Sequence, residues 1–122
     1  MPPSAMRFDK RTVIVTGAAG HLGRAVAKSF ADLGANLVLL DMREEAPGAH
    51  VFVSVDLRSA DSVRAAVGKA LERFGRIDVL CNIAGAFRMG PPMHETKDAD
   101  WDFLFDVNAK SVLHTARAVS HP

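Results

Sequence analysis

The sequence contains one cysteine and no tyrosine, and no apolar run is long enough to cross a bilayer. A lone cysteine, Cys81, excludes a disulfide within the chain and fits a reducing compartment. The first seven residues contain no apolar segment of signal-peptide length. These absences predict a soluble cytoplasmic protein with no membrane partner.

The charge is balanced: 15 Lys and Arg residues face 14 Asp and Glu residues, giving a formal net charge of +1. No basic cluster favours a nucleic-acid partner, and no acidic tract indicates a disordered tail. The five histidines show no metal-ligand spacing with one another or with Cys81, so we expect no metal site.

A glycine-rich stretch, residues 16–23 (TGAAGHLG), lies between an apolar run at 12–15 and a segment with helical apolar spacing. A strand, a tight turn and a helix start together present free backbone N–H groups and partial positive charge to a phosphate. Glycine allows the turn and the close approach of the pyrophosphate and of the helix. Three glycines alone are a weak signal, so the remaining sequence has to support it.

Apolar strands and amphipathic helices alternate along the chain. We expect strands at 11–16, 36–41, 50–55 and 77–81, and helices at 22–33, from Ser59 to about 74, and at 98–119. Gly34 and Gly75 follow the first two helices, where a left-handed residue commonly ends a helix. This alternation predicts one α/β domain over 1–122, a Rossmann-type doubly wound parallel sheet of about four strands in the order 3-2-1-4.

Asp41 ends the predicted second strand, eighteen positions after Gly23. A dinucleotide site places an acid there to accept hydrogen bonds from the adenosine ribose. The carboxylate also repels a 2′-phosphate by about 4 kcal/mol at 4 Å and an effective dielectric near 20, which favours NAD over NADP. Arg43 partly offsets this preference, and the alternative is an ordinary solvated carboxylate.

Polar residues also follow the third and fourth strands. Asp56 can accept from an adenine amino group while Leu57 packs on the ring, or Asp56 can belong only to the turn before Ser59. Asn82 can bridge neighbouring loops through its amide and also contact the cofactor. The small residues Ala84 and Gly85 would let the backbone approach the nicotinamide ribose.

Asn108 falls on the apolar stripe of the last helix, whose members are Trp101, Leu104, Phe105, Asn108, Val112, Ala116 and Val119. That position predicts a buried carboxamide, which needs hydrogen-bond partners or costs about 1–3 kcal/mol. This pattern allows two roles for Asn108: a structural amide that forms hydrogen bonds across a local kink, or a catalytic amide.

Together these motifs resemble the short-chain dehydrogenase/reductase family. The resemblance rests on the glycine turn, Asp41, Asp56-Leu57, residues 81–85 (CNIAG) and residues 107–109 (VNA), and it spans nearly the whole chain. It implies a nicotinamide cofactor, NAD rather than NADP, and a catalytic Asn108 that holds a water in a proton relay. The residues that we expect to contact the cofactor are Gly17, Ala19, Gly20, His21, Leu22, Gly23, Asp41, Met42, Asp56, Leu57, Asn82, Ala84 and Gly85.

Three departures from the family pattern stand out. His21 occupies a position where the common pattern has glycine, a variant similar to the extended branch of the family, so its side chain either points away from the pyrophosphate or donates to it. Ile83 replaces a usual asparagine. The family's later Ser and Tyr-x-x-x-Lys residues, which supply the general acid/base, have no counterpart before Pro122.

We therefore expect the amino-terminal part of a longer oxidoreductase, which moves a hydride between nicotinamide and an alcohol or ketone. The 122 residues alone are expected to be inactive. The alternative is a non-catalytic dinucleotide-binding or interaction module that is complete at this length. The last helix is apolar on a second face (Phe103, Val107, Ala118), and the resemblance implies a homo-oligomer that assembles through it.

Overall fold

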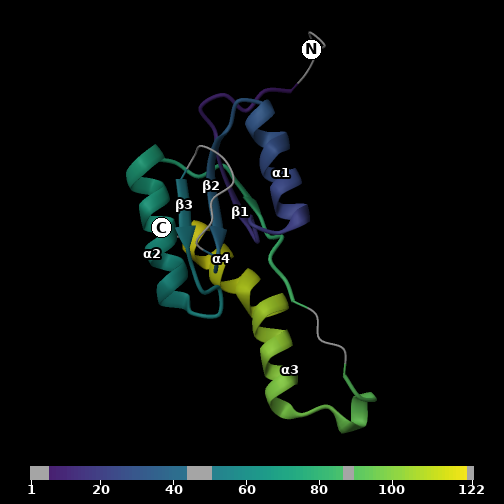
Figure 1. Cartoon of the computed structure of the whole chain (residues 1–122). Helices are drawn as coiled ribbons and strands as arrows, with labels where there is room; N and C mark the ends of the chain where they lie inside the picture. The colour runs from purple at the N-terminus through teal and green to yellow at the C-terminus, as the bar shows by residue number, and fades with distance from the viewer. Residues whose placement is uncertain (1–5, 44–50, 87–89, 121–122) are drawn as a thin grey trace.

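The chain folds into a four-stranded parallel sheet with helices on both faces (Figure 1). The computed structural model describes residues 6–43, 51–86 and 90–120. The strands lie in the order β3-β2-β1-β4, as the sequence predicts. The elements are β1 (Thr12–Thr16), α1 (His21–Asp32), β2 (Asn36–Asp41), β3 (Val51–Ser54), α2 (Ala60–Phe74), β4 (Val79–Cys81), η1 (Met93–Glu95), α3 (Asp98–Phe105), η2 (Asp106–Lys110) and α4 (Ser111–Ser120).

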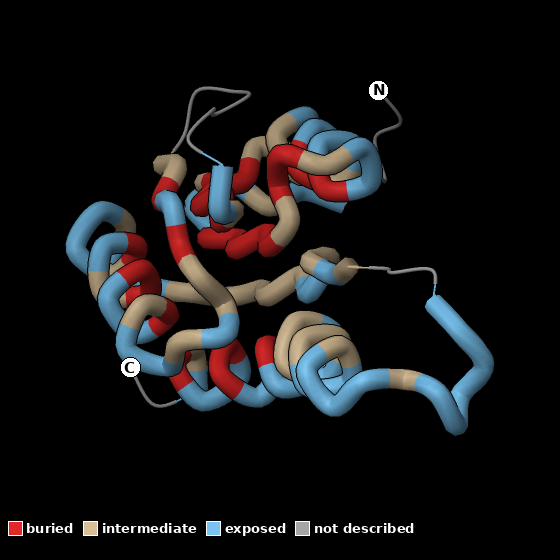
Figure 2. Tube along the Cα trace, turned by 60° about the horizontal axis from the view of Figure 1, so that its bottom comes forward, coloured by how far each residue is buried: buried red, intermediate tan, exposed pale blue. Residues whose placement is uncertain are grey.

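Alternate residues of β1 and β2 build two separate cores. Val13, Val15 and Leu39 pack with α1 on one face of the sheet. Ile14 and Val38 pack on the other face, in the cluster that α2 and α4 complete. Every residue of β1 is buried, and in Figure 2 buried residues mark the strands and the inner faces of the helices. Burial on both faces explains why these strands are apolar without alternation.

Local signals set the ends of α1 and α2 where the sequence predicts them. The Ser59 hydroxyl accepts a hydrogen bond from the Ser62 N–H and caps α2. Gly75 follows α2 with φ +75°, and Gly34 follows the last turn of α1 with φ +90°. Both glycines adopt the left-handed conformation that a side chain disfavours.

The last helix differs most from the expectation. It is one continuous run, but a π-helical turn, η2, separates α3 from α4. Because a π turn takes in one more residue than an α turn, a stripe drawn with a constant period loses its phase there. The predicted apolar stripe is therefore wrong: Trp101, Phe105 and Val112 are exposed. The buried face of α4 instead consists of Ser111, His114, Thr115 and Ala118.

Helix α3 extends away from the sheet (Figure 1), and none of its residues is buried. Among the described residues between β4 and α3, the short turn η1 is the one regular element. The third and fourth strands are shorter than predicted, at Val51–Ser54 and Val79–Cys81, and His50 lies outside the described residues. In the described part of the chain, no helix is long and apolar enough to span a membrane.

Asp78 anchors the amino-terminal edge of the sheet. Its Oδ2 accepts from the Thr12 N–H at 2.8 Å and from Arg76 Nε at 2.9 Å, and Arg11 lies 3.7 Å from Oδ1. The Arg76 guanidinium, followed by the Thr12 N–H, holds the pKa of this carboxyl below its usual range. In the Arg76–Asp78 ion pair, the Asp78 side chain is only 12% exposed. Salt therefore screens this ion pair less than it screens a fully exposed one.

Asp78→Asn should lower the free energy of unfolding at pH 7 by about 1 kcal/mol. A carboxyl whose native pKa is depressed adds stability above its unfolded pKa, about 3.9, and loses it as the pH falls through the native value. The acid side of the stability curve should therefore be flatter in the variant. Urea unfolding between pH 7 and pH 2 measures both effects, and Asp32→Asn, at an exposed pair with Lys28, serves as the control with little change. Identical pH profiles for wild type and Asp78→Asn would contradict this role.

Candidate functional site

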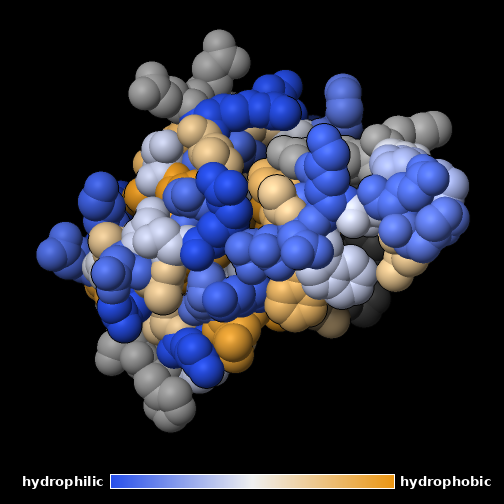
Figure 3. Space-filling model, turned by 90° about the horizontal axis from the view of Figure 1, so that it is seen from below, coloured by the Kyte–Doolittle hydropathy of each residue, from blue (hydrophilic) through white to orange (hydrophobic). Residues whose placement is uncertain are grey.

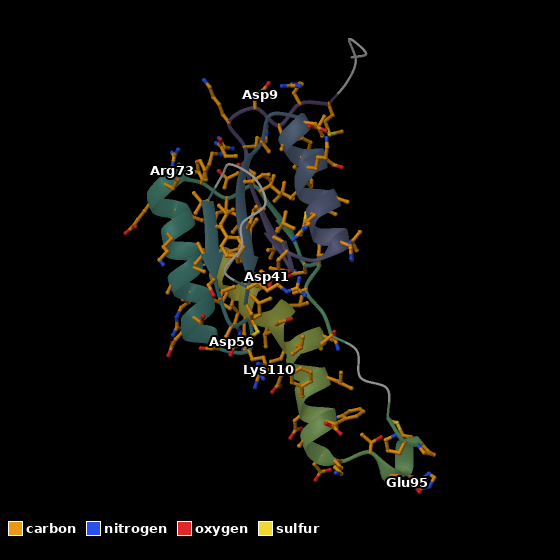
Figure 4. All side chains as sticks on the ribbon, in the orientation of Figure 1. Asp9, Asp41, Asp56, Arg73, Glu95 and Lys110 are labelled. Carbon is orange, nitrogen blue, oxygen red and sulfur yellow. The ribbon has the colours of Figure 1, made fainter. Side chains whose placement is uncertain are left out.

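A pocket of about 460 Å³ opens at the carboxyl ends of the strands. The glycine turn, the ends of β2 and β3 and the segment after β4 supply its walls. Asp41 and Asp56 lie at this same end of the sheet in Figure 4, and Figure 3, which views the molecule from below, shows apolar surface between polar side chains there. The lining residues are Gly17, Gly20, His21, Leu22, Gly23, Asp41, Met42, Arg43, Val55, Asp56, Leu57, Arg58, Ile83, Ala84, Gly85 and Val107.

The glycine turn is packed too tightly for side chains at two of its three glycines. A Cβ on Gly23 would lie 2.0 Å from the Gly17 carbonyl oxygen, and a Cβ on Gly17 would lie 2.9 Å from the Ala84 backbone. Gly17 also has φ +65°. A Cβ on Gly20 would meet only an ordinary contact at 3.4 Å, so Gly20 matters for the space that it leaves in the pocket rather than for the turn.

His21 is the first residue of α1, and its position accepts a side chain without backbone strain. Among the described residues, only Lys10 is a non-glycine with positive φ. His21 is exposed and lines the pocket. The first bond of the helix runs from Arg24 N–H to the Gly20 carbonyl. No described residue accepts from the N–H groups of His21, Leu22 and Gly23, so the helix start offers three free donors.

Asp41 and Arg43 hold the glycine turn from β2. Asp41 Oδ2 accepts from the Ala19 N–H at 3.0 Å, and Asp41 Oδ1 accepts from the Arg43 N–H at 3.1 Å. The Arg43 guanidinium donates to the Ala19 carbonyl at 3.2 Å. Ala19 is buried and does not line the pocket, so in the structure it is a point of attachment for the turn, and its contact with the cofactor stays a prediction. Asp41 keeps unused lone pairs for a ligand, because a carboxylate has about four acceptor sites.

Thr16 joins the ends of β1 and β4, a role that the sequence reading missed. Its buried hydroxyl accepts from the N–H groups of Ile83 and Ala84 at 3.0 Å each. The same hydroxyl donates to the Cys81 carbonyl at 3.4 Å. A threonine at the end of a buried strand, directly before the glycine turn, was the available signal.

Asp56 lines the pocket and also forms the turn before α2, so the two interpretations of its role are compatible. Its Oδ1 accepts from the Arg58 N–H at 3.0 Å and from Arg58 Nε at 3.1 Å. The Arg58 guanidinium, followed by its N–H, holds the pKa of Asp56 below the usual range. Asp56 is therefore an ionised acceptor near neutral pH.

Asn82 bridges to α4. Its amide oxygen accepts from the Thr115 hydroxyl at 2.8 Å, and Asn82 does not line the pocket. The contact is structural, but it joins the end of β4 to a helix rather than to a neighbouring loop, and the cofactor contact stays a prediction.

Asn108 lies in the π turn and pairs with the backbone after β4. Its Nδ2 donates to the Ala86 carbonyl and its Oδ1 accepts from the Ala86 N–H, both at 2.9 Å. A Cβ on Gly85 would lie 2.9 Å from Oδ1, so glycine keeps this pairing possible. The expectation of a buried Asn108 is wrong, because the side chain is exposed. Its partner is the neighbouring backbone and not the core.

No group of three His, Cys, Asp or Glu residues in the described ranges is arranged to hold a metal. Burial raises the pKa of the Cys81 thiol, so it stays protonated near neutral pH and is a poor nucleophile. The polar groups that the described residues bring to the pocket are backbone N–H groups, the carboxylates of Asp41 and Asp56, the guanidinium groups of Arg43 and Arg58, and His21.

The family model described as short chain dehydrogenase matches residues 11–122. The chain belongs to this family. Oxidoreductase UcpA of Salmonella typhimurium is 39% identical to this chain over 123 residues, which cover 93% of the chain and 46% of the relative. The chain thus spans about half the length of the curated relatives it matches.

Two solved structures support the same assignment. A short-chain dehydrogenase/reductase from Brucella melitensis, described as a glucose/ribitol dehydrogenase, superposes with a TM-score of 0.86 at 34% identity and covers 94% of this chain and 52% of that one. A metagenomic short-chain oxidoreductase in complex with NADP superposes with a TM-score of 0.86 at 33% identity, covering 93% and 56%. The chain therefore has the family's Rossmann-like fold.

Gly23→Ala should lower the free energy of unfolding by at least about 2 kcal/mol, because the new methyl group would overlap the Gly17 carbonyl. Gly68→Ala, in the middle of α2 with nothing within 4 Å of its Cβ position, should instead raise it by about 0.5–1 kcal/mol. Urea unfolding followed by circular dichroism measures both variants. Wild-type stability in Gly23→Ala would contradict the tight turn.

Proposed function

We propose that the pocket binds a nicotinamide adenine dinucleotide and that the whole protein transfers a hydride between nicotinamide and an alcohol or ketone. One observation carries the proposal: the three free N–H groups at the start of α1 lie in the same pocket as the carboxylate of Asp41. Free N–H groups and a helix dipole suit a pyrophosphate, and a carboxylate at the end of the second strand suits ribose hydroxyls.

Each wall of the pocket has a distinct task in this proposal. His21, Leu22 and Gly23 donate to the pyrophosphate, and Gly20 leaves room for it. Asp41 and Met42 face the adenosine ribose, and Asp56 and Leu57 face the adenine. Ala84 and Gly85 lie beside the nicotinamide ribose, with Asn82 behind them. The bound nicotinamide supplies the hydride acceptor, and these residues orient it at the carboxyl edge of the sheet.

We propose NAD as the preferred cofactor. The negative charge of Asp41 opposes a 2′-phosphate, whereas the Arg43 guanidinium at the same turn attracts one. The carboxylate is at the strand end, where the ribose hydroxyls would lie, and this position supports NAD. The metagenomic short-chain oxidoreductase was solved in complex with NADP, so at least one relative of this fold binds the other cofactor.

A fluorescence titration of the chain with NADH and NADPH tests both the site and the preference. NADH should bind about tenfold or more tightly, since one screened charge pair is worth more than 1.4 kcal/mol. Asp41→Asn should reduce that ratio, and Arg43→Ala should increase it. Equal or tighter binding of NADPH by the wild type would refute the preference, and binding of neither nucleotide would refute the site.

We propose that Asn108 is a catalytic residue that holds a water of a proton relay, and that the chain is the amino-terminal part of a longer catalytic domain. The sequence has no tyrosine, so the proton-transfer residue of the relay must come from outside these 122 residues. The 122-residue chain should therefore show no change in NADH absorbance with any alcohol or ketone. Turnover by the purified chain would show that these 122 residues can supply the proton-transfer group themselves, and it would contradict the proposal.

The second apolar face predicted from Phe103, Val107 and Ala118 is not one open surface, because Ala118 is buried in the core and Phe103 and Val107 are half-buried. We therefore propose that a second copy of the protein contacts the apolar side chains that stay exposed on α3 and α4. Trp101 and Phe105 are 53% exposed, and Leu113 is 44% exposed. Large apolar side chains gathered in this way favour a protein interface. Sedimentation should give an oligomer that Trp101→Asp weakens, and a monomer at all concentrations would contradict the proposal. We also propose a small-molecule substrate and no nucleic-acid partner. We propose a cytoplasmic location, which the lone Cys81 supports.

A further inference from the structure

The loop between β3 and α2, residues 55–58, lines the pocket where we place the adenosine, and several backbone hydrogen bonds hold it. Val55 N–H donates to the Asp41 carbonyl at 2.9 Å, and Asp56 N–H donates to the Ser62 hydroxyl at 3.1 Å. The Asp56 carbonyl accepts from Ser59 N–H at 3.0 Å. Within residues 6–43, 51–86 and 90–120, nothing accepts from the N–H of Leu57, although Leu57 lines the pocket.

His114 holds this loop from the opposite side. Its Nδ1 lies 2.8 Å from the Leu57 carbonyl oxygen, across 57 positions of sequence. A carbonyl only accepts, so Nδ1 carries the hydrogen, and it does so in the neutral and in the protonated ring alike. His114 is 7% exposed and does not line the pocket, so it acts on a ligand only through Leu57.

The buried face of α4 has an apolar member, Ala118, that needs no partner to pack against α2. A buried imidazole at the same face is costly unless it is hydrogen-bonded, and the Leu57 carbonyl provides the bond. The loop has a second attachment to the same helical run, since the Arg58 guanidinium lies 5.6 Å from the ring centroid of Phe103 on α3. Helices α3 and α4 therefore both hold the loop at residues 55–58 in place.

We propose that His114 is a positioning residue for adenine recognition: by holding the Leu57 carbonyl, it keeps the free Leu57 N–H beside the carboxylate of Asp56. A donor next to an acceptor matches the adenine edge, where the ring nitrogen N1 accepts and the 6-amino group donates. The inference rests on the proposed dinucleotide function, and it assigns to α4 a role in choosing the base.

Hypoxanthine tests this match, because its N1 carries a hydrogen and its position 6 carries an oxygen. We compare the binding of NADH and of reduced nicotinamide hypoxanthine dinucleotide by fluorescence titration of the full chain. The wild type should bind NADH about tenfold or more tightly, since two mismatched hydrogen bonds cost at least about that factor. His114→Leu should bring the ratio of the two dissociation constants close to one.

Two variants separate positioning from simple stability. His114→Asn keeps an N–H near the place of Nδ1 and should restore most of the base preference. Ala118→Gly, one turn further along the same buried face, should lower the melting temperature while leaving the ratio unchanged. If His114→Leu does not fold, His114→Met takes its place, because it also lacks a donor at position 114, and its ratio should likewise fall close to one.

The inference is overturned if His114→Leu keeps the wild-type ratio of the two dissociation constants. It is also overturned if Ala118→Gly loses the base preference to the same extent, or if the wild type shows no preference between the two bases. Failure of the wild type to bind NADH would instead overturn the proposed function itself. The two failures are therefore distinguishable in one set of titrations.

Discussion

The hydroxyl of Thr16 is the interaction on which the pocket depends. It joins the end of β1 to the backbone that leaves β4, through two accepted hydrogen bonds and one donated bond. Because these strands are neighbours in the order β3-β2-β1-β4, their following segments diverge from this point. The glycine turn goes to one side and the Ala84–Gly85 segment to the other, and Gly17 packs against Ala84 where they part. The pocket exists because the chain reverses its strand order here.

Most polar side chains expected to meet a ligand also bind the protein itself. Asp41 holds the glycine turn at Ala19, Asp56 holds Arg58, and Asn108 holds Ala86. Each of these bonds fixes a side chain before any ligand arrives, which lowers the entropy cost of binding. A substitution at any of them therefore changes both the local backbone and the ligand contact, and matched control variants are needed to separate the two.

The π turn divides the last helix into two parts with different surroundings. Its extra residue places Asn108 beside Ala86, and it turns a small, polar face of α4 toward α2 and the loop at 55–58. The apolar residues of α3 consequently remain exposed on an arm that leaves the sheet. The same irregularity thus supports the site and leaves the surface that we assign to a second copy.

The local sequence predicted the fold well where one short-range signal decided the outcome. The apolar strands, the helix ends at Ser59, Gly34 and Gly75, and the strand order follow from residue type and spacing, and the structure confirms them. Most of the residues that the sequence predicts to contact the cofactor line one pocket in the structure. The pattern failed at the face of the last helix, where the π turn takes in one extra residue and changes the phase of the apolar stripe.

The sequence by itself determined the element order, the glycine turn and the acids at the strand ends, because these depend on backbone conformation and on hydrophobic periodicity. Only the tertiary structure decided which groups meet across long separations. The bonds from Thr16 to Ile83, from Asp41 to Ala19 and from His114 to Leu57 join segments that no local pattern connects. Hydrogen bonds act over about 3 Å, so such partners are chosen by the packing of the sheet and helices and not by the spacing of residues along the chain.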